Sequence, residues 1–356
     1  MKRTVLFMAA LMTLSCAWAQ KISKNEAKSL QTFLSQNAAK GGNNAEALRM
    51  VGSNVAACPG IKVENGHVTE IDFKGKDLAG TLALSGFPAL QKIDVSSNKI
   101  TSLTLNNNPA LVEVNAGKNR IHTMTITGCP QVQTIRVNKN RLAEFDLGTV
   151  PLLKRFNVSG NMLEALDVSN ATNLEYLNVM SNNLQSLNVS GCQSLKSLYA
   201  AFNDLTDITF AGLVKLENLN VNSNKIAKLY IQDLPAIETL LCSDNHMAGL
   251  TVKGCKTINE IWAPYNDLTS FTVEDAQNLA FVNVEWNDLT YLSLANMNFL
   301  QRVNAANNQL ITLDVSFDPM LRFVNVTNNN MLTDLRTDAD SQLRHVIGYA
   351  DYEYGF

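Results

Sequence analysis

Residues 175–184 read EYLNVMSNNL, and the same frame returns as NEIWAPYNDL at residues 259–268. Both stretches place aliphatic or small apolar residues at alternating positions, followed by an Asn and, two residues later, a Leu. Alternation with a period of two is typical of a β-strand that buries one of its faces. The Asn and Leu then mark the turn that ends the strand, so the sequence predicts a repeated unit of strand and turn.

An Asn recurs every 21 residues from residue 98 to residue 329 without a break in phase. Apolar residues stand three and five positions before it, and Ile, Leu or Met stands two positions after it. Because a carboxamide both donates and accepts hydrogen bonds, it can satisfy backbone groups that a buried turn would leave unpaired. We therefore interpret the column as structural and not catalytic. This Asn ladder comprises Asn98, Asn119, Asn140, Asn161, Asn182, Asn203, Asn224, Asn245, Asn266, Asn287, Asn308 and Asn329.

The pattern L-x-x-L-x-L-x-x-N-x-L resembles the leucine-rich repeat family. Its 21-residue form, with a second alternating apolar pair such as Leu187 and Val189, is similar to bacterial short repeats of the internalin J kind. The resemblance covers about residues 68–332. It implies a β-rich solenoid with parallel strands on the concave face, and it implies protein recognition, which the family mostly mediates. One copy cannot bury its apolar face alone, whereas stacked copies form a continuous core.

The second half of each copy has no helical spacing. Its outward residues, such as Thr104, Asp146 and Thr251, suit extended chain better than helix. We therefore expect extended segments on the convex side as well. Layers of similar width on both sides predict a fairly flat solenoid with gentle curvature.

The ends of the chain differ from the repeats. Residues 1–19 combine Lys2, Arg3, an apolar stretch and an A-x-A site, which predicts a signal peptide, with a lipid anchor on Cys16 as the alternative. Residues 20–66 are predicted to form an N-terminal cap with one or two short helices, the first starting at a capping box of Ser23 and Glu26. Residues 67–332 form the solenoid of about 13 repeats, and residues 333–356 a C-terminal cap folded over the last rung.

These features predict an exported protein of the periplasm, the cell surface or the extracellular space. No later apolar run approaches the roughly 18 residues of a membrane span, so no transmembrane segment is expected. Without Lys2 and Arg3 the chain has 27 basic and 32 acidic residues, a balance that gives no reason to expect nucleic acid as a partner.

No catalytic motif stands out in the chain. Cys129, Cys192 and Cys255 share one repeat column but lie three rungs apart, roughly 14 Å by strand spacing, beyond the reach of a disulfide. We interpret them as small buried residues. The four histidines share no rung, and the motifs of nucleophilic, metal or phosphate chemistry are missing. We expect no enzyme, no cofactor and no metal site.

Function is therefore expected on the concave face, which is lined by the residues six, four, two and one positions before each Asn. In the first four copies these positions are polar and lean basic. We expect the basic residues to steer an acidic partner towards the face. They are Lys92, Lys118, Arg136, Lys139 and Arg155.

In the later copies the same positions carry large apolar side chains. An apolar patch on a soluble protein usually marks a binding surface, and Trp and Tyr dominate binding hot spots. Cross-strand packing that only stabilises the sheet is the alternative interpretation. The predicted ligand-binding patch comprises Tyr176, Tyr199, Phe202, Leu241, Trp262, Tyr265, Phe281, Trp286 and Phe323.

Three functions remain open from the sequence. A protein partner can dock with the aromatic patch as its anchor, in adhesion or surface recognition. A glycan can instead stack on Trp262, Tyr265 and Trp286. Its hydroxyl groups would then bind the polar side chains of Glu260, Asn283, Glu285 and Asn304. The third possibility is a structural envelope component without a discrete ligand.

Overall fold

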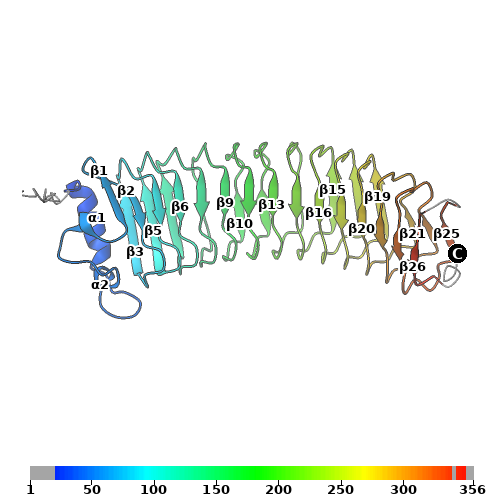
Figure 1. Cartoon of the computed structure of the whole chain (residues 1–356), viewed down its shortest axis with the longest axis horizontal. Coiled ribbons are helices and arrows are strands. Elements are labelled where there is room, and N and C mark those ends of the chain that lie inside the picture. The colour runs from blue at the N-terminus through cyan, green and yellow to red at the C-terminus, as the bar shows by residue number, and fades with distance from the viewer. Residues whose placement is uncertain (1–20, 339–341, 350–356) are drawn as a thin grey trace, which may run out of the picture.

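The computed structural model describes residues 21–338 and 342–349, so the predicted signal peptide at residues 1–19 lies outside the described residues. The chain winds into an elongated, gently curved solenoid, and α1 closes its N-terminal end (Figure 1). One long sheet runs from end to end, and four shorter sheets line the return side of the rungs. The predicted solenoid with extended chain on both sides is confirmed.

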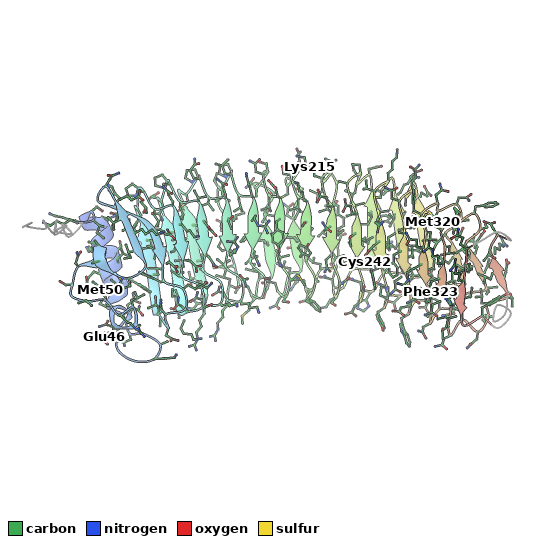
Figure 2. The ribbon with its side chains drawn as sticks, viewed as in Figure 1. Glu46, Met50, Lys215, Cys242, Met320 and Phe323 are labelled. Carbon is green, nitrogen blue, oxygen red and sulfur yellow. The ribbon has the colours of Figure 1, made fainter. Side chains whose placement is uncertain are left out.

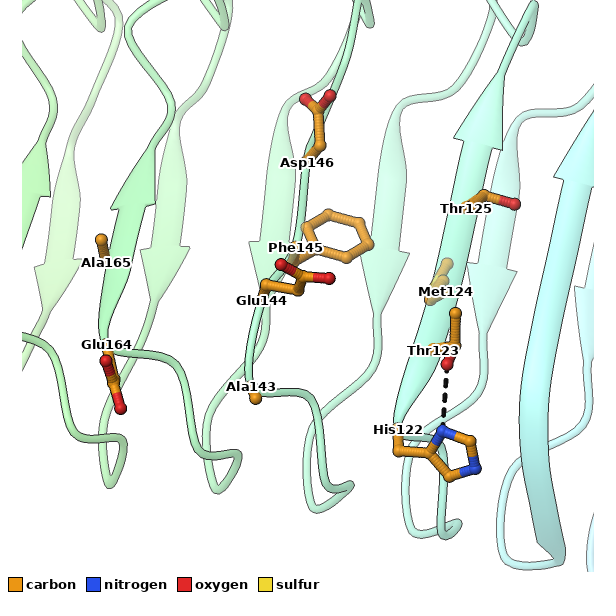
Figure 3. A pocket seen from close by; sticks show the side chains of 10 residues that line it. All are labelled: His122, Thr123, Met124, Thr125, Ala143, Glu144, Phe145, Asp146, Glu164 and Ala165. Atoms are coloured by element: carbon orange, nitrogen blue, oxygen red, sulfur yellow. Dashed lines mark hydrogen bonds between the residues drawn. The ribbon is translucent and has the colours of Figure 1, made fainter.

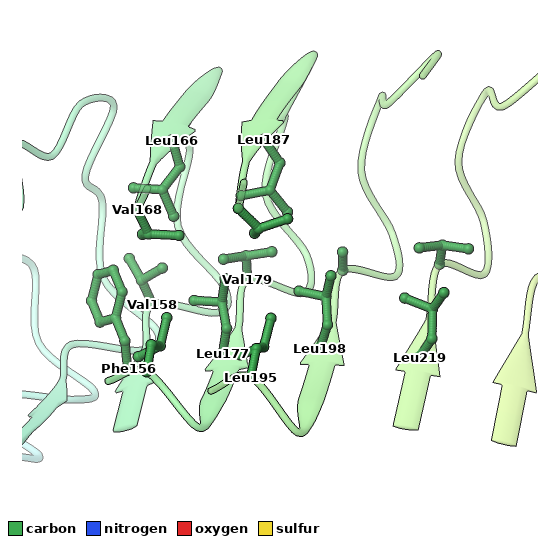
Figure 4. Packing of buried hydrophobic residues seen from close by; sticks show 14 of the residues in the cluster. Phe156, Val158, Leu166, Val168, Leu177, Val179, Leu187, Leu195, Leu198 and Leu219 are labelled. Carbon is green, nitrogen blue, oxygen red and sulfur yellow. The ribbon is translucent and has the colours of Figure 1, made fainter. Parts of the chain in front are cut away.

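The long sheet contains fifteen strands, and all neighbours pair in parallel except β1 with β2. The repeats stack in register, so that Leu177, Leu198 and Leu219 lie opposite one another and point into the core (Figure 4). The strands are β1 (Ile61–Glu64), β2 (His67–Asp72), β4 (Lys92–Asp94), β6 (Glu113–Asn115), β8 (Thr134–Arg136), β9 (Arg155–Asn157), β11 (Tyr176–Asn178), β13 (Ser197–Tyr199), β14 (Asn218–Asn220), β16 (Thr239–Leu241), β18 (Glu260–Trp262), β20 (Phe281–Asn283), β22 (Arg302–Asn304), β24 (Phe323–Asn325) and β26 (His345–Ile347).

The return side carries shorter parallel ladders of two or three strands each. Their buried residues meet those of the long sheet in one continuous core. The strands are β3 (Ala79–Ser85), β5 (Lys99–Asn106) and β7 (Thr123–Thr127); β10 (Ala165–Asp167) and β12 (Ser186–Asn188); β15 (Lys228–Gln232), β17 (Gly249–Lys253) and β19 (Ser270–Glu274); and β21 (Tyr291–Ser293), β23 (Thr312–Asp314) and β25 (Asp334–Arg336).

Each interruption of the return ladder coincides with a phenylalanine at an inward position. Phe145 and Phe210 lie in rungs without a return strand, and β19, which carries Phe271, does not pair with β21. The other inward positions on this side hold Leu, Ile, Val or Met. The ring of Phe145 packs against that of Phe156 in β9, with centroids 5.5 Å apart. Phe271 nevertheless pairs in register with Leu250 of β17, so a ring at this position does not by itself prevent strand pairing.

The Asn ladder joins each turn to the turn before it. In Asn203, Oδ1 accepts the Leu184 N–H at 3.1 Å, while Nδ2 donates to the carbonyl groups of Val179 at 3.1 Å and Ala200 at 3.0 Å. The corresponding three bonds recur in every copy from Asn119 to Asn329, for example at Asn287. Each carboxamide therefore bonds one backbone N–H and two backbone carbonyl groups, and each of these carbonyl groups accepts from two successive ladder Asn residues.

The N-terminal cap comprises α1 (Lys24–Leu34), α2 (Asn44–Ala47) and the 3-10 turn Val55–Ala57. The predicted capping box of Ser23 and Glu26 is present at the start of α1. Two side-chain amides of the cap pair with the outer edge of β3: Gln36 bonds both backbone groups of Thr81 at 2.7 Å, and Asn44 bonds those of Ala79. An open strand edge is a site of aggregation, and these amides close it.

The C-terminal end extends the solenoid. β25 adds to the return ladder beside β23, and β26 adds to the long sheet beside β24. Leu335 and Val346 supply the apolar residues that pack against the core. The described residues after 332 thus continue both ladders, and the cap predicted for residues 333–356 stays a prediction.

A second buried column lies ten residues after each ladder Asn. Asn108 in this column donates to the Leu84 carbonyl group, 24 residues earlier, and accepts the Phe87 N–H. The thiols of Cys129, Cys192 and Cys255 donate to the carbonyl groups at the same offset, at 3.2–3.7 Å. Burial raises the pKa of Cys192 to about 12. The cysteines of this column therefore remain protonated donors in the core.

Asp318 occupies this column near the C-terminus. Its Oδ1 accepts the Met297 N–H at 2.7 Å, but its buried Oδ2 has no partner among the described residues. Burial raises the pKa of Asp318 to about 7, the Met297 N–H lowers it, and the charges of Asp338 and Asp314 raise it. Protonated Asp318 can donate a hydrogen bond, as Asn108 and the cysteines of this column do, whereas its carboxylate form cannot.

Asn203→Ala is expected to lower the free energy of unfolding by about 1–3 kcal/mol, because it leaves the buried Leu184 N–H unpaired and removes one of the two Asn donors from each of the Val179 and Ala200 carbonyl groups. Chemical denaturation of this variant and of the exposed control Asn183→Ala measures the difference. Equal stability of the two variants would contradict the structural role of the ladder.

Asp318→Asn is expected to stabilise the protein at pH 8 by about 1–3 kcal/mol and to change little at pH 4. Unfolded Asp318 releases its proton near its ordinary pKa of 3.8, whereas the folded residue holds its proton until about pH 7. The free energy of unfolding of the wild-type protein therefore falls as the pH rises from 4 to 7, and Asp318→Asn removes that loss. Thermal melts across this range test the prediction, and a difference independent of pH would refute it.

Candidate functional site

The predicted patch lies on the outer side of the long sheet, where side chains form two rows along the solenoid. Strand pairing places Thr239, Glu260, Phe281, Arg302, Phe323 and His345 in the first row. The second row holds Leu241, Trp262, Asn283, Asn304, Asn325 and Ile347. Neighbours in a row come from adjacent strands, so side chains within a row and on its diagonals can touch.

Trp262 is held by its neighbours and is half-buried. Its ring packs against Phe281 of the next strand with centroids 4.6 Å apart. Its Nε1 donates to the Glu260 carboxylate at 3.2 Å. Leu241 stands beside Trp262 in the second row, on the other neighbouring strand. Trp262 therefore contributes to the sheet surface as well as to the predicted patch.

Tyr265 and Trp286 occupy a different position, directly before the ladder Asn in the turn. Their rings stack with centroids 6.0 Å apart and planes 13° from parallel. Both side chains are about half exposed, at 55% and 51%. Phe202 holds the same position in an earlier rung and is 56% exposed. We call Phe202, Tyr265 and Trp286 the aromatic ridge.

The backbone of the aromatic ridge is left-handed. The φ angles are +58° at Phe202, +57° at Tyr265 and +54° at Trp286. Bulky residues rarely adopt this conformation, which costs about 1–2 kcal/mol relative to a right-handed one. Other copies fill the position with Gly, Ser, Asp, Asn or Lys. The turn therefore does not require an aromatic residue. None of the three side chains is buried enough for core packing to offset the energetic cost of the left-handed backbone.

The remaining predicted residues lie in two places. Tyr176 packs against Tyr199 with centroids 5.6 Å apart, and the Arg155 guanidinium lies 4.4 Å from the Tyr176 ring centroid. Phe323 lies at the C-terminal end of the sheet, where Figure 2 labels it, with the Arg302 guanidinium 5.1 Å from its ring centroid. The predicted patch is thus a set of separate aromatic pairs along the sheet.

Trp262, Phe281 and Phe323 share one hollow of about 330 Å³ with Arg302, Asn304 and Asn325. Its wall is aromatic, and Arg302 is the charged residue that lines it. Sequence reasoning found the aromatic residues but missed Arg302. Its position six residues before Asn308 is one of the outward-facing strand positions and could have identified it as a site residue.

The basic residues predicted to steer an acidic partner are partly neutralised. Lys92 and Arg136 both contact the Glu113 carboxylate, at 3.4 and 2.6 Å. Lys118 and Lys139 are exposed in the left-handed turn column. Arg155 covers Tyr176 as described above.

The return side holds features that sequence reasoning missed. Tyr230 and Tyr291 are exposed there, and a groove of about 650 Å³ lies where Phe145 interrupts the ladder (Figure 3). Glu144, Asp146 and Glu164 line the groove, and the Nδ1 atom of His122 lies 3.0 Å from Thr123 Oγ1. The signal for the groove was the phenylalanine in an otherwise aliphatic column.

Two searches for other kinds of site found nothing in the described part of the chain. Residues 21–338 and 342–349 hold no cluster of His, Cys, Asp or Glu able to bind a metal ion. No helix in these ranges is both long and apolar enough to cross a membrane.

Comparison with solved structures identifies the fold. The leucine-rich effector protein YopM from Yersinia pestis matches with 24% identity over 78% of this chain and 76% of its own, with a TM-score of 0.57. The LRIM1/APL1C complex matches with 16% identity over 78% and 61%, with a TM-score of 0.56. The functional domain of InlJ from Listeria monocytogenes matches with 20% identity over 75% and 68%, with a TM-score of 0.43. No protein-family model and no curated protein matches the sequence.

The matches with TM-scores above 0.5 show that the chain has the leucine-rich repeat fold, as its resemblance to bacterial 21-residue repeats predicted. At these identities the likeness establishes the fold and leaves the ligand open.

Trp286→Asn is expected to leave the free energy of unfolding within about 1 kcal/mol of wild type, because relief of the left-handed strain offsets the lost stacking on Tyr265. Asn already occupies this position in the next two rungs, at Asn307 and Asn328. Trp262→Ala should cost about 1–2 kcal/mol, since it removes ring packing and a hydrogen bond. Denaturant titrations compare the two, and a larger loss for Trp286→Asn would mean that the ridge stabilises the fold.

Proposed function

We propose that this protein is an exported, non-enzymatic binding protein that recognises a protein partner through the outer face of the long sheet. The aromatic ridge and the pair of Trp262 and Phe281 anchor the partner. Adhesion or recognition at a cell surface is the role we assign to it. In this proposal residues 1–19 direct export, residues 20–66 and 333–356 cap the ends, and residues 67–332 form the binding solenoid.

The left-handed backbone of the aromatic ridge is the observation that carries this proposal. Three aromatic side chains accept unfavourable φ angles and stay half exposed. Strain that the fold does not need is concentrated at functional sites in proteins. Exposed Trp and Tyr are also the residues that contribute most to protein interfaces. A binding role explains both the strain and the residue types.

The fold supports a protein as the partner. Solenoids present extended surfaces suited to large ligands, and the LRIM1/APL1C match is itself a complex of two proteins. The long sheet offers such a surface with backbone hydrogen bonds already satisfied by the Asn ladder. In a structural envelope component without a ligand, only the stacking of Tyr265 on Trp286 would offset the strain at these two residues.

The test is affinity capture with a matched surface control. Wild-type protein and the double variant Tyr265→Asn, Trp286→Asn are immobilised and exposed to a cell-surface protein fraction, and bound proteins are quantified by mass spectrometry. Loss of two hot-spot residues is expected to reduce capture of the partner by about 30-fold or more.

The control is Tyr230→Thr, which removes a 65% exposed aromatic residue from the return side. Thr stands at the same position in the next rungs, at Thr251 and Thr272. This variant should capture the partner as wild type does. Equal capture by the double variant and wild type would reject the ridge as the anchor.

A further inference from the structure

The hollow beside Trp262 is lined by groups that donate hydrogen bonds. Trp262, Phe281 and Phe323 form its aromatic walls, and its polar groups are Asn283, Arg302, Asn304 and Asn325. A volume of about 330 Å³ is at the small end of sites that hold a single small molecule. No Asp or Glu is among the residues that line it.

The turns fix the direction of the two amides. Oδ1 of Asn304 accepts the Ala306 N–H at 3.3 Å, and Oδ1 of Asn325 accepts the Thr327 N–H at 3.1 Å. With each oxygen held by its own backbone, the Nδ2 group of each residue points away from the turn. Within residues 21–338 and 342–349 neither nitrogen has a hydrogen-bond partner, so both remain available as donors.

Arg302 is the cation of this site. Its guanidinium lies over Phe323, and it has no carboxylate partner in the part of the chain that the structure describes. Arg136 and Arg336, by contrast, pair with Glu113 and Asp334 at 2.6 and 2.7 Å. Stacking on the ring restrains the guanidinium and leaves its N–H groups free for a planar anion.

Two carboxylates on neighbouring rungs of the same face are already bonded. Glu285 accepts from Asn283 Nδ2 at 3.3 Å, and Glu260 accepts from Trp262 Nε1. Neither carboxylate lines the hollow. The Arg302 end therefore offers donors to an incoming ligand without a competing acceptor.

We propose that this hollow binds an acidic sugar residue, a hexuronate within a polysaccharide. The carboxylate pairs with the Arg302 guanidinium, a match that can use two parallel N–H bonds. The amide groups of Asn304 and Asn325 donate to hydroxyl oxygens. The C–H face of the ring packs on Trp262 and Phe281, as apolar faces do on aromatic side chains.

A hexuronate uses the whole site, whereas an acidic protein side chain uses only a part of it. A lone carboxylate would occupy Arg302 and leave the two amides and the Trp262 wall without a partner. The sugar carries an anion, several acceptors and a flat apolar face within one ring. This site shares Trp262 and Phe281 with the proposed protein interface but not the aromatic ridge, because neither Tyr265 nor Trp286 lines the hollow.

The test titrates three acidic oligosaccharides into the protein: tetragalacturonate, an alginate tetrasaccharide and a hyaluronan tetrasaccharide. Tryptophan fluorescence reports on Trp262 and Trp286, of which only Trp262 lines the hollow, and calorimetry gives the Kd. At least one of them should bind saturably, and its carboxyl-reduced form, which keeps the rings and loses the charge, should bind at least about tenfold more weakly.

Variants locate the site. Arg302→Gln should weaken binding at least about tenfold, and Arg302→Lys, which keeps the charge but not the fork, should fall between that variant and wild type. Arg155→Gln is the matched control, because Arg155 also covers an aromatic ring on the same face but lies outside the hollow. Thermal melts verify that each variant is folded.

Three results would overturn the proposal: no binding by any of the three oligosaccharides, equal binding by tetraglutamate, or equal losses in Arg155→Gln and Arg302→Gln. Trp286→Asn separates this site from the aromatic ridge of the proposed protein interface. It should retain the acidic sugar even where it loses a protein partner, so that either proposal can fail without the other.

Discussion

The carboxamide of the ladder Asn is the interaction on which the rest of this solenoid depends. A strand of three residues ends in a turn whose backbone points into the core, away from water and from strand partners. Unpaired backbone groups in that place would cost more than the short strand contributes. Because the Asn bonds both its own turn and the turn before it, every rung is held in register by its neighbour.

The same constraint shapes the surface. The residue before each Asn must take a left-handed backbone, since the chain turns there to bring the carboxamide inward. Small and polar residues adopt this backbone conformation at little energetic cost. An aromatic residue at this position therefore needs a reason other than the turn itself. Exposed Trp286 therefore indicates a binding role more strongly than an exposed tryptophan on a regular strand would. Trp262, by contrast, lies on a regular strand and packs on its neighbours, so its presence says less about a binding role.

The two sides of the solenoid obey different limits. The long sheet stays continuous even at Phe156 of β9, which pairs with both neighbouring strands, and the Asn ladder holds the adjacent turns. The return side has no such ladder, and its strand pairing is interrupted at the rungs of Phe145 and Phe210. The second buried column holds apolar residues such as Val150 as well as hydrogen-bond donors. Asn108 and the cysteines satisfy a carbonyl group there, whereas Asp318 can do so only when it is protonated.

The repeat period, the strand positions and the role of the Asn column could be read from the sequence, because each depends on neighbours at a fixed spacing along the chain. Outward positions could be read for the same reason, and they include all the aromatic residues of the candidate site. The C-terminal residues were harder to assign, because Leu335 and Val346 continue the ladders outside the regular phase.

The sequence by itself determined that this chain is a leucine-rich solenoid with large apolar residues on one face, since a repeat of 21 residues repeats its geometry. Only the tertiary structure decided how those residues combine. Strand register and turn conformation separate the stacked pair of Tyr265 and Trp286 from the pair of Trp262 and Phe281, and they place Arg302 beside Phe323. Such contacts depend on side-chain direction across different rungs, which a pattern along one chain does not contain.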